Sequence, residues 1–150
     1  MLIAITGASG FIGSALTSFL EKDGHKILSV SRSTSGDVLW DPTSGQIEAE
    51  KLEGIDAVIH LAGENIASRR WTDKQKRRIL DSRVEGTKLL TKSIVNLSNP
   101  PSVFLSGSAI GIYGNRGDEE LDEESSRGSG FLSDVVDQWE KSTAEDEAAG

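Results

Sequence analysis

The sequence contains no cysteine, which excludes disulfide bonds, zinc ribbons, iron–sulfur clusters and thiol nucleophiles. A chain without cysteine is expected in the cytoplasm by default. Long apolar runs are missing too, because no segment approaches the ~18 residues of a membrane span. The opening segment, Met1–Thr6, has no charged stretch ahead of an apolar one, so no secretory signal is visible.

An excess of positive charge is also absent. The chain of 150 residues has a net charge of -8, which argues against a general nucleic-acid-binding protein. The charges are unevenly placed, since nine of the 16 basic residues lie between Arg69 and Lys92. This cluster is either a solvated helix face or a helix that faces an anion such as a phosphate. The acidic segment from Asp118 to Glu124 is expected to be a solvated loop.

Apolar periodicity predicts an alternation of strands and helices. Short apolar runs predict buried strands, and apolar residues at helical spacing predict amphipathic helices. Residues 33–54 are rich in turn-forming residues and are expected to hold at most a short excursion. The alternation implies right-handed crossovers and a parallel sheet, hence a Rossmann-type doubly wound α/β fold. The expected strands are Leu2–Thr6, Lys26–Ser31, Asp56–Leu61 and Val103–Ser106, and the expected helices are 12–20, Thr72–Leu97 and Phe131–Ala149.

A glycine-rich turn stands between the first strand and the first helix. Residues 6–13 are TGASGFIG, in the position that a dinucleotide-binding fingerprint requires. Its first glycine permits a tight turn, the second lets backbone amides approach a pyrophosphate, and the third allows close packing of the helix against the strand. The N-terminus of the following helix favours phosphate. The cofactor-binding residues expected here are Gly7, Gly10, Phe11, Ile12 and Gly13.

The end of the second strand selects the cofactor. Sites for NAD usually place a carboxylate there for the ribose hydroxyls, whereas this chain has Ser31 and Arg32. The guanidinium of Arg32 offers a planar fork for a 2′-phosphate, so NADP(H) is favoured over NAD(H). Asp37, five residues on, complicates this prediction, and the alternative is that Arg32 is an ordinary surface residue.

Further motifs carry a resemblance to a known superfamily. They are TGASGFIG (6–13), SR (31–32), LWDP (39–42), DAVIHLAGENIA (56–67), RW (70–71), SRVEGT (82–87), SGSAIGIYG (106–114) and FLSDVVDQWE (131–140). On these motifs the chain resembles the atypical extended short-chain dehydrogenases/reductases, in the branch called epimerase family proteins and related to nucleoside-diphosphate-sugar epimerases. The resemblance implies a protein about twice as long. Residues 1–150 would then be its NAD(P)-binding Rossmann domain, without the C-terminal substrate lobe.

The resemblance also implies roles for single residues. Leu61, Ala62 and Gly63 would lie along the adenosine and the nicotinamide ribose, and Arg83 would reach the cofactor where typical members have asparagine. Ser108 matches the catalytic serine that hydrogen-bonds the reacting carbonyl. Ser106 is the alternate match for that serine and is otherwise expected beside the cofactor.

The chain departs from the superfamily at the Tyr-x-x-x-Lys pair that transfers the proton. The corresponding segment begins with Phe131 and has Val135 four residues later, and neither side chain can carry a proton. The single tyrosine, Tyr113, belongs to a turn and is either structural or catalytic. The groups left to supply a proton are Ser108, Tyr113, Glu64 or a residue beyond Gly150.

Two functions remain open at this point. The first is an NADP(H)-dependent oxidoreductase or epimerase-like enzyme acting on a carbonyl compound or sugar nucleotide, and the second is a non-catalytic NADP(H)-binding sensor or interaction module. The resemblance makes a homodimer one possible assembly, whereas the negative net charge and the lack of a long apolar run predict no nucleic-acid or membrane partner. His60, within a strand pattern, is expected to be a hydrogen-bonded core residue, and the two histidines predict no metal site.

Overall fold

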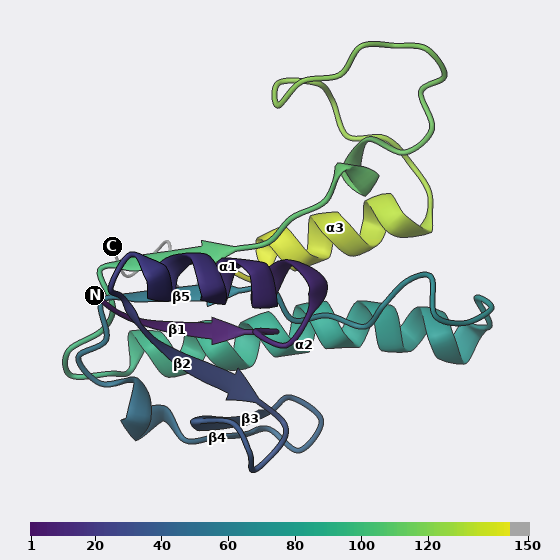
Figure 1. Cartoon of the computed structure of the whole chain (residues 1–150). Coiled ribbons are helices and arrows are strands. Elements are labelled where there is room, and N and C mark those ends of the chain that lie inside the picture. Colours follow the sequence, from purple (N-terminus) through teal and green to yellow (C-terminus); the bar gives the residue numbers. More distant parts are fainter. Residues whose placement is uncertain (145–150) are drawn as a thin grey trace.

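The computed structural model describes residues 1–144, which form a six-stranded sheet with helices on both faces (Figure 1). Two short 3₁₀ helices, Ala49–Leu52 and Ile110–Tyr113, lie in the connections. The strands are β1 (Leu2–Thr6), β2 (Lys26–Ser31), β3 (Val38–Asp41), β4 (Gln46–Ile47), β5 (Ala57–His60) and β6 (Val103–Ser106). The helices are α1 (Phe11–Lys22), α2 (Asp73–Val95) and α3 (Phe131–Lys141).

The strand order β4-β3-β2-β1-β5-β6 confirms the Rossmann-type doubly wound fold. Strands β3, β2, β1, β5 and β6 are parallel, and the two-residue β4 pairs antiparallel with β3 at one edge. The chain winds outward from β1 in both directions, which makes the β1–β5 junction the topological switch point. Thr6 pairs with His60, and His60 pairs with Ser106, so these three strands end at one level.

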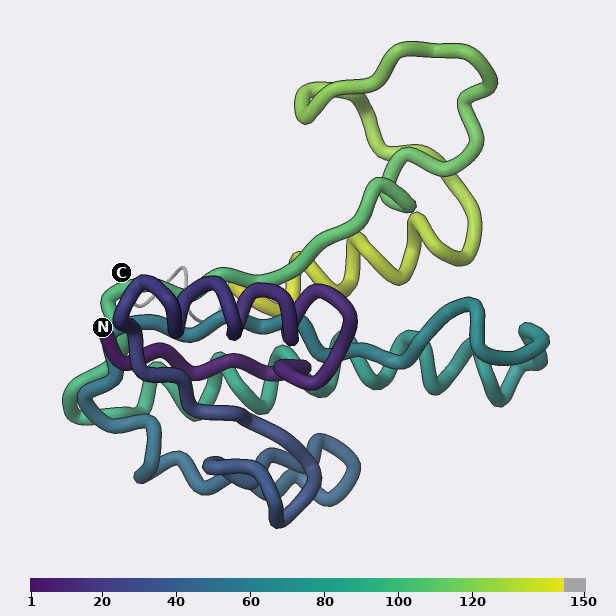
Figure 2. The backbone as a smooth tube through the Cα atoms, viewed as in Figure 1, coloured from purple at the N-terminus to yellow at the C-terminus, as the bar shows by residue number. Residues whose placement is uncertain are grey.

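Alternation along the strands separates two apolar layers. Ile3 and Ile5 of β1 face α1, where they pack with half-buried leucines of that helix. Ala4 faces the other side and packs with Leu90 and Ile94 of α2. The connection from residue 107 to 130 projects away from the sheet, and α3 returns from it to pack on α2 (Figure 2). A parallel sheet needs this cover because both of its faces are apolar.

Most element bounds agree with the sequence prediction, with three differences. Residues 33–54, read as turns, contain β3 and β4, because Val38 and Trp40 are buried although the strands are short. Helical spacing in 72–97 predicts Leu80, Val84, Leu90 and Ile94 as inward positions of α2, but Leu80 is only half-buried and the neighbouring Ile79 is fully buried instead. The part of the predicted last helix that runs on to Ala149 lies outside the described residues from residue 145 onward.

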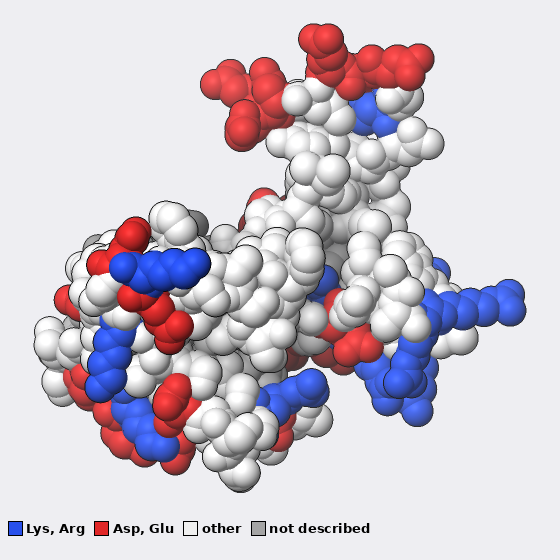
Figure 3. All heavy atoms as spheres, viewed as in Figure 1, with Lys and Arg blue, Asp and Glu red and all other residues white. Residues whose placement is uncertain are grey.

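The charged clusters lie at separate ends of the molecule. Figure 3 shows acidic side chains on the projecting connection and basic side chains at the N-terminal end of α2. The acidic residues between Asp118 and Glu124 are exposed, as the sequence predicted for a solvated loop. Among the described residues, no helix is long and apolar enough to span a membrane.

Candidate functional site

The glycine-rich turn after β1 closes on itself. The Gly10 amide donates to the Gly7 carbonyl at 2.9 Å, and Gly7 adopts a positive φ of 71° that side chains disfavour. A Cβ on Gly13 would lie 2.1 Å from the Gly7 carbonyl oxygen, so only glycine lets α1 approach the turn this closely. The tight packing predicted for Gly13 is therefore against the turn itself.

The N-terminus of α1 directly follows this turn and has no side-chain cap. Gly10 is the N-cap residue of the helix. Phe11 and Ile12 are exposed there, at 96% and 66%, and the first turn contains no acidic residue. Unsatisfied backbone N–H groups and the helix dipole make such an end suitable for a phosphate.

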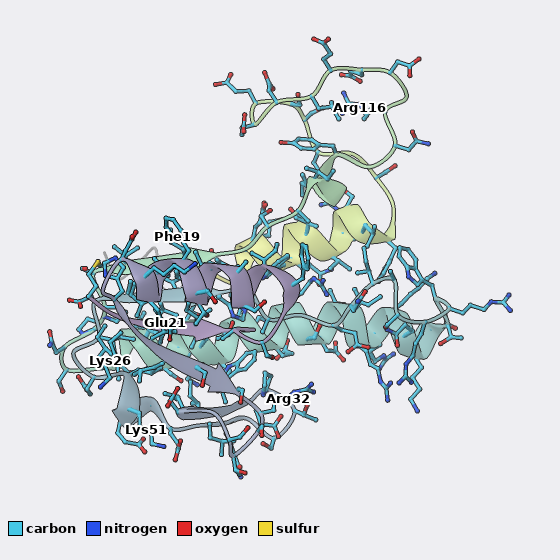
Figure 4. All side chains as sticks on the ribbon, viewed as in Figure 1. Phe19, Glu21, Lys26, Arg32, Lys51 and Arg116 are labelled. Atoms are coloured by element: carbon cyan, nitrogen blue, oxygen red, sulfur yellow. The ribbon has the colours of Figure 1, made fainter. Side chains whose placement is uncertain are left out.

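Arg32 follows β2 at the same edge of the sheet and is exposed (Figure 4). Hydrogen bonds from Ser44 and Thr43, aided by the positive charge of Arg32, lower the pKa of the Asp41 carboxyl. Asp37, the complicating carboxylate, accepts hydrogen bonds from the Ser29 amide at 2.8 Å and hydroxyl at 2.7 Å. These hydrogen bonds lower the pKa of the Asp37 carboxyl and hold the carboxylate beside β2. The negative charge of Asp37 is therefore already stabilised by hydrogen bonds.

The Ser31 side chain folds back onto the loop after β2. Its hydroxyl accepts a hydrogen bond from the Ser33 amide at 3.1 Å, and the Ser33 hydroxyl contacts that of Ser35 at 2.8 Å. A Cβ on Gly36 would lie 2.5 Å from the Ser31 hydroxyl oxygen, so the loop closes tightly beside this serine. Arg32 therefore stands next to a loop rich in hydroxyl groups.

A buried polar chain fixes the end of β5. His60 is fully buried, with Nδ1 2.6 Å from the Thr6 hydroxyl and Nε2 3.1 Å from the Thr87 hydroxyl. The Thr6 hydroxyl oxygen also accepts from the Leu61 and Ala62 amides at 3.1 Å each. These bonds hold the segment after β5 beside the glycine-rich turn. They confirm that His60 is a hydrogen-bonded core residue.

His60 should make folding stability depend on pH. Burial lowers the pKa of His60 from 6.5 to about 4 in the folded protein. As pH falls from 6.5 to 4 the unfolded chain takes up the proton first, so about 3 kcal/mol of stability is lost in that window. Urea unfolding at pH 7.5 and pH 4.5 measures the loss, and in His60→Gln the decrease over this window should be smaller. Equal pH dependence in both proteins would contradict the assignment.

Arg83 braces the same segment from α2. Its Nη1 donates to the carbonyls of Glu64 at 3.0 Å and Ile79 at 3.2 Å, and its guanidinium lies against Gly63. The guanidinium also sits over the Trp139 ring of α3 at 5.4 Å, and burial lowers its pKa. Arg83 thus connects the segment after β5 with α2 and α3, immediately beside Gly63, one of the predicted cofactor-binding residues.

Two residues that the sequence reasoning missed hold Glu64. The Glu64 amide donates to the Ser82 hydroxyl at 3.0 Å, and the Gln75 side-chain amide donates to the Glu64 carboxylate at 3.1 Å. Gln75 is only 3% exposed, which is rare for a polar side chain on a helix with a charged surface. No local pattern marks Gln75, although Ser82 stands in one of the motifs quoted above.

The predicted catalytic serines lie at the end of β6 and just beyond it. Ser106 is half-buried at the strand end, and Ser108 is exposed, with its hydroxyl donating to the Glu140 carboxylate of α3. Tyr113 lies in the second 3₁₀ helix, which packs on α3, and within the described residues no hydrogen bond joins it to Ser108. The site therefore brings Ser108 to Glu140, which the sequence reasoning did not name.

The two residues that the resemblance assigns to the proton-transfer positions, Phe131 and Val135, are packing residues. Phe131 contacts the Trp71 ring edge to face at 5.5 Å, and the Lys76 ammonium lies 5.6 Å from the Phe131 ring centre. Val135 is buried at 2% exposure. The structure thus leaves no titratable group at either position.

The switch-point turn and its open helix define a Rossmann-type nucleotide-binding domain. The chain belongs to the NAD dependent epimerase/dehydratase family, whose family model matches residues 3–131. It is 37% identical over 152 residues to an epimerase family protein of Mycobacterium bovis, covering 99% of this chain and 50% of that protein. The chain thus spans about half the length of the curated relatives that it matches.

Solved structures agree with this assignment. A nucleoside-diphosphate sugar epimerase from Corynebacterium glutamicum has 38% identity and a TM-score of 0.85, with 100% of this chain and 32% of that chain covered. Human epimerase family protein SDR39U1, crystallised with NADPH, has 35% identity and a TM-score of 0.83, with 95% and 48% covered.

Proposed function

We propose that residues 1–150 form the NADP(H)-binding domain of an oxidoreductase or sugar-nucleotide epimerase-like enzyme. The observation that carries this proposal is the uncapped N-terminus of α1, held against the glycine turn at the topological switch point. A pyrophosphate placed there would meet free backbone N–H groups and the positive end of the helix dipole. The NADPH in the related human structure supports the choice of ligand.

The residues around the turn fit a dinucleotide. Backbone of the turn would bind the pyrophosphate, Arg32 would bind the 2′-phosphate, and the segment after β5 would lie along the ribose and nicotinamide. The bound nicotinamide would supply the hydride acceptor or donor. The proposed cofactor-binding residues are Gly7, Gly10, Phe11, Ile12, Gly13, Ser31, Arg32, Leu61, Ala62, Gly63, Arg83 and Ser106.

The substrate would be a carbonyl compound or a sugar nucleotide. The relative from Corynebacterium glutamicum is described as a nucleoside-diphosphate sugar epimerase, which supports the second class. Ser108 would hydrogen-bond the reacting oxygen, as the resemblance implies, and Tyr113 is the other candidate. A homodimer and a cytoplasmic location stay predictions of the sequence.

A second candidate function is a non-catalytic NADP(H)-binding sensor or interaction module. The observation in its favour is that Phe131 and Val135 occupy the positions of the usual proton-transfer pair as packing residues. In this alternative the cofactor would bind without turnover, and the exposed Ser108 hydroxyl would have no chemical role.

Calorimetric titration of the full-length protein with NADPH and NADH tests the proposal. We expect NADPH to bind at least ~10-fold more tightly, because only NADPH carries the phosphate that Arg32 would pair with. Binding of neither nucleotide would refute the proposed function. Binding of NADH alone would retain the dinucleotide site and refute the role of Arg32.

A further inference from the structure

Ser108 and Glu140 meet at the edge of the sheet where the proposed cofactor site lies. The Gly107 amide donates to the His60 carbonyl at 2.9 Å, so the segment after β6 leaves the sheet beside the segment after β5. The next residue, Ser108, donates its hydroxyl hydrogen to the Glu140 carboxylate. Both side chains line a shallow hollow at this edge, together with Ser106, Gly107 and Thr143.

The position of Glu140 is fixed by the residue before it. Trp139 is 7% exposed, and its ring lies 3.4 Å from the position of a Cβ on Gly107. The guanidinium of Arg83 covers the same ring, and the Ser142 hydroxyl donates to the Trp139 carbonyl at 2.5 Å. The buried tryptophan thus holds this turn of α3 against the strand ends, and the next side chain reaches Ser108.

Glu140 differs from the other carboxylates of α3. Asp134 pairs with Arg127, and Asp137 pairs with both Arg127 and Lys141. No ion pair within residues 1–144 includes Glu140, whose side-chain contact is the neutral hydroxyl of Ser108. Within the described residues, the Glu140 carboxylate therefore faces a hydroxyl group and not a cation.

We propose that Ser108 and Glu140 transfer the substrate proton in place of the missing tyrosine and lysine; this rests on the proposed function. In alcohol oxidation, hydride leaves the alcohol carbon for the oxidised nicotinamide while the alcohol O–H proton passes to the Ser108 oxygen. The Ser108 proton passes at the same time to the Glu140 carboxylate. The products are a ketone, the reduced nicotinamide and a protonated Glu140, and reduction of a ketone runs the same steps in reverse.

Alcohol oxidation would begin with an ionised Glu140, and ketone reduction would begin with a protonated Glu140. Ser108 contacts the substrate oxygen and is the catalytic residue, whereas Glu140 acts through it. A serine hydroxyl is too weak an acid to hold the charge alone, so the carboxylate sets the pH dependence. The substrate class is therefore a secondary alcohol or its ketone, which includes a ring hydroxyl of a sugar nucleotide.

Variants at Glu140 separate a proton relay from a structural tether. Glu140→Gln keeps an oxygen that accepts the Ser108 hydrogen bond but cannot take up a proton, and Glu140→Asp keeps the carboxylate. Asp134→Asn, which removes one charge from the same helix, is the matched control. Each variant of the full-length protein is assayed for NADPH binding, and for NADP⁺ reduction with a panel of secondary alcohols and UDP-glucose across pH 5–9.

The variants should differ in kcat and not in NADPH affinity. We expect Glu140→Gln and Ser108→Ala to lower kcat by about 10²- to 10⁴-fold, with NADPH affinity within twofold of the unmodified protein. Glu140→Asp should recover part of kcat, and Asp134→Asn should match the unmodified protein. The pH profile of kcat should change in Glu140→Gln, which has no carboxyl group, and should stay the same in Asp134→Asn.

A measurement without turnover checks the contact itself. In protein labelled with ¹³C at glutamate carboxyl carbons, the Glu140 signal is assigned by its loss in Glu140→Gln. Ser108→Ala should change the chemical shift of this signal, because the Glu140 carboxylate loses its hydrogen-bond donor. An unchanged chemical shift would overturn the proposal, as would full activity of Glu140→Gln or NADPH binding without turnover of any panel compound. Failure to bind either nucleotide would instead refute the proposed function.

Discussion

Gly13→Ala is expected to destabilise the protein by about 3 kcal/mol or more and to abolish dinucleotide binding. The added methyl group would lie 2.1 Å from the Gly7 carbonyl oxygen and 2.9 Å from the Ala8 Cα. Both neighbours are backbone atoms, which cannot rotate away as a side chain can. The helix and the turn must therefore separate, and the free N–H groups of α1 would no longer face the bound phosphate.

Gly24→Ala is the matched control for this prediction. Gly24 has a φ of 82° but nothing lies within 4 Å of an added Cβ, so only backbone strain of about 1 kcal/mol is expected. Urea unfolding and NADPH calorimetry on both variants distinguish crowding from strain. If Gly13→Ala bound NADPH as the unmodified protein does, the turn would not be the phosphate site.

Arg32→Ala is expected to weaken NADPH binding by about 10- to 100-fold and to change NADH binding by less than twofold. A charge-assisted hydrogen bond to the 2′-phosphate contributes roughly 1.5–3 kcal/mol, and NADH has no such phosphate. Arg32 is exposed and points away from the core, so its removal should leave the free energy of unfolding almost unchanged (Figure 4). Calorimetric titration with both nucleotides measures the two losses.

Arg32→Lys and Lys51→Ala complete that experiment. Lysine keeps the charge but cannot form two parallel bonds to one phosphate, so an intermediate affinity for NADPH is expected. Lys51 pairs with Glu48 on the first 3₁₀ helix, and its removal tests whether any lost surface cation weakens binding. Equal losses of NADPH and NADH affinity in Arg32→Ala would show that this residue does not read the 2′-phosphate.

The fold was largely readable from the sequence because its signals are local. The glycine-rich turn follows a five-residue apolar run and precedes helical spacing, and the structure has β1 and α1 at these positions. The bounds of β2 and β6 also agree with the prediction. The sequence did not predict strands β3 and β4, because they are only four and two residues long. Alternation of apolar and polar residues over so few positions is not distinguishable among turn-forming residues.

The site could be predicted only in part from the sequence, because its contacts join segments that are far apart along the chain. The sequence named Ser108 through a motif but left the proton-transfer group open, and Glu140, 32 residues further on, was not among the candidates. Gln75 was also missed, since its contact with Glu64 depends on how α2 passes the end of β5. Such contacts follow from the packing of whole elements, which no local pattern specifies.

The amino-acid order by itself determined the parallel α/β layout, the glycine turn and the family. These features depend on backbone conformation and apolar periodicity over a few neighbouring residues. Only the tertiary structure decided which polar groups meet. The His60 ring contacts the Thr6 and Thr87 hydroxyls because β1 and β5 pair in register and α2 packs on the same sheet. The Ser108 hydroxyl contacts the Glu140 carboxylate because buried Trp139 holds α3 against the strand ends.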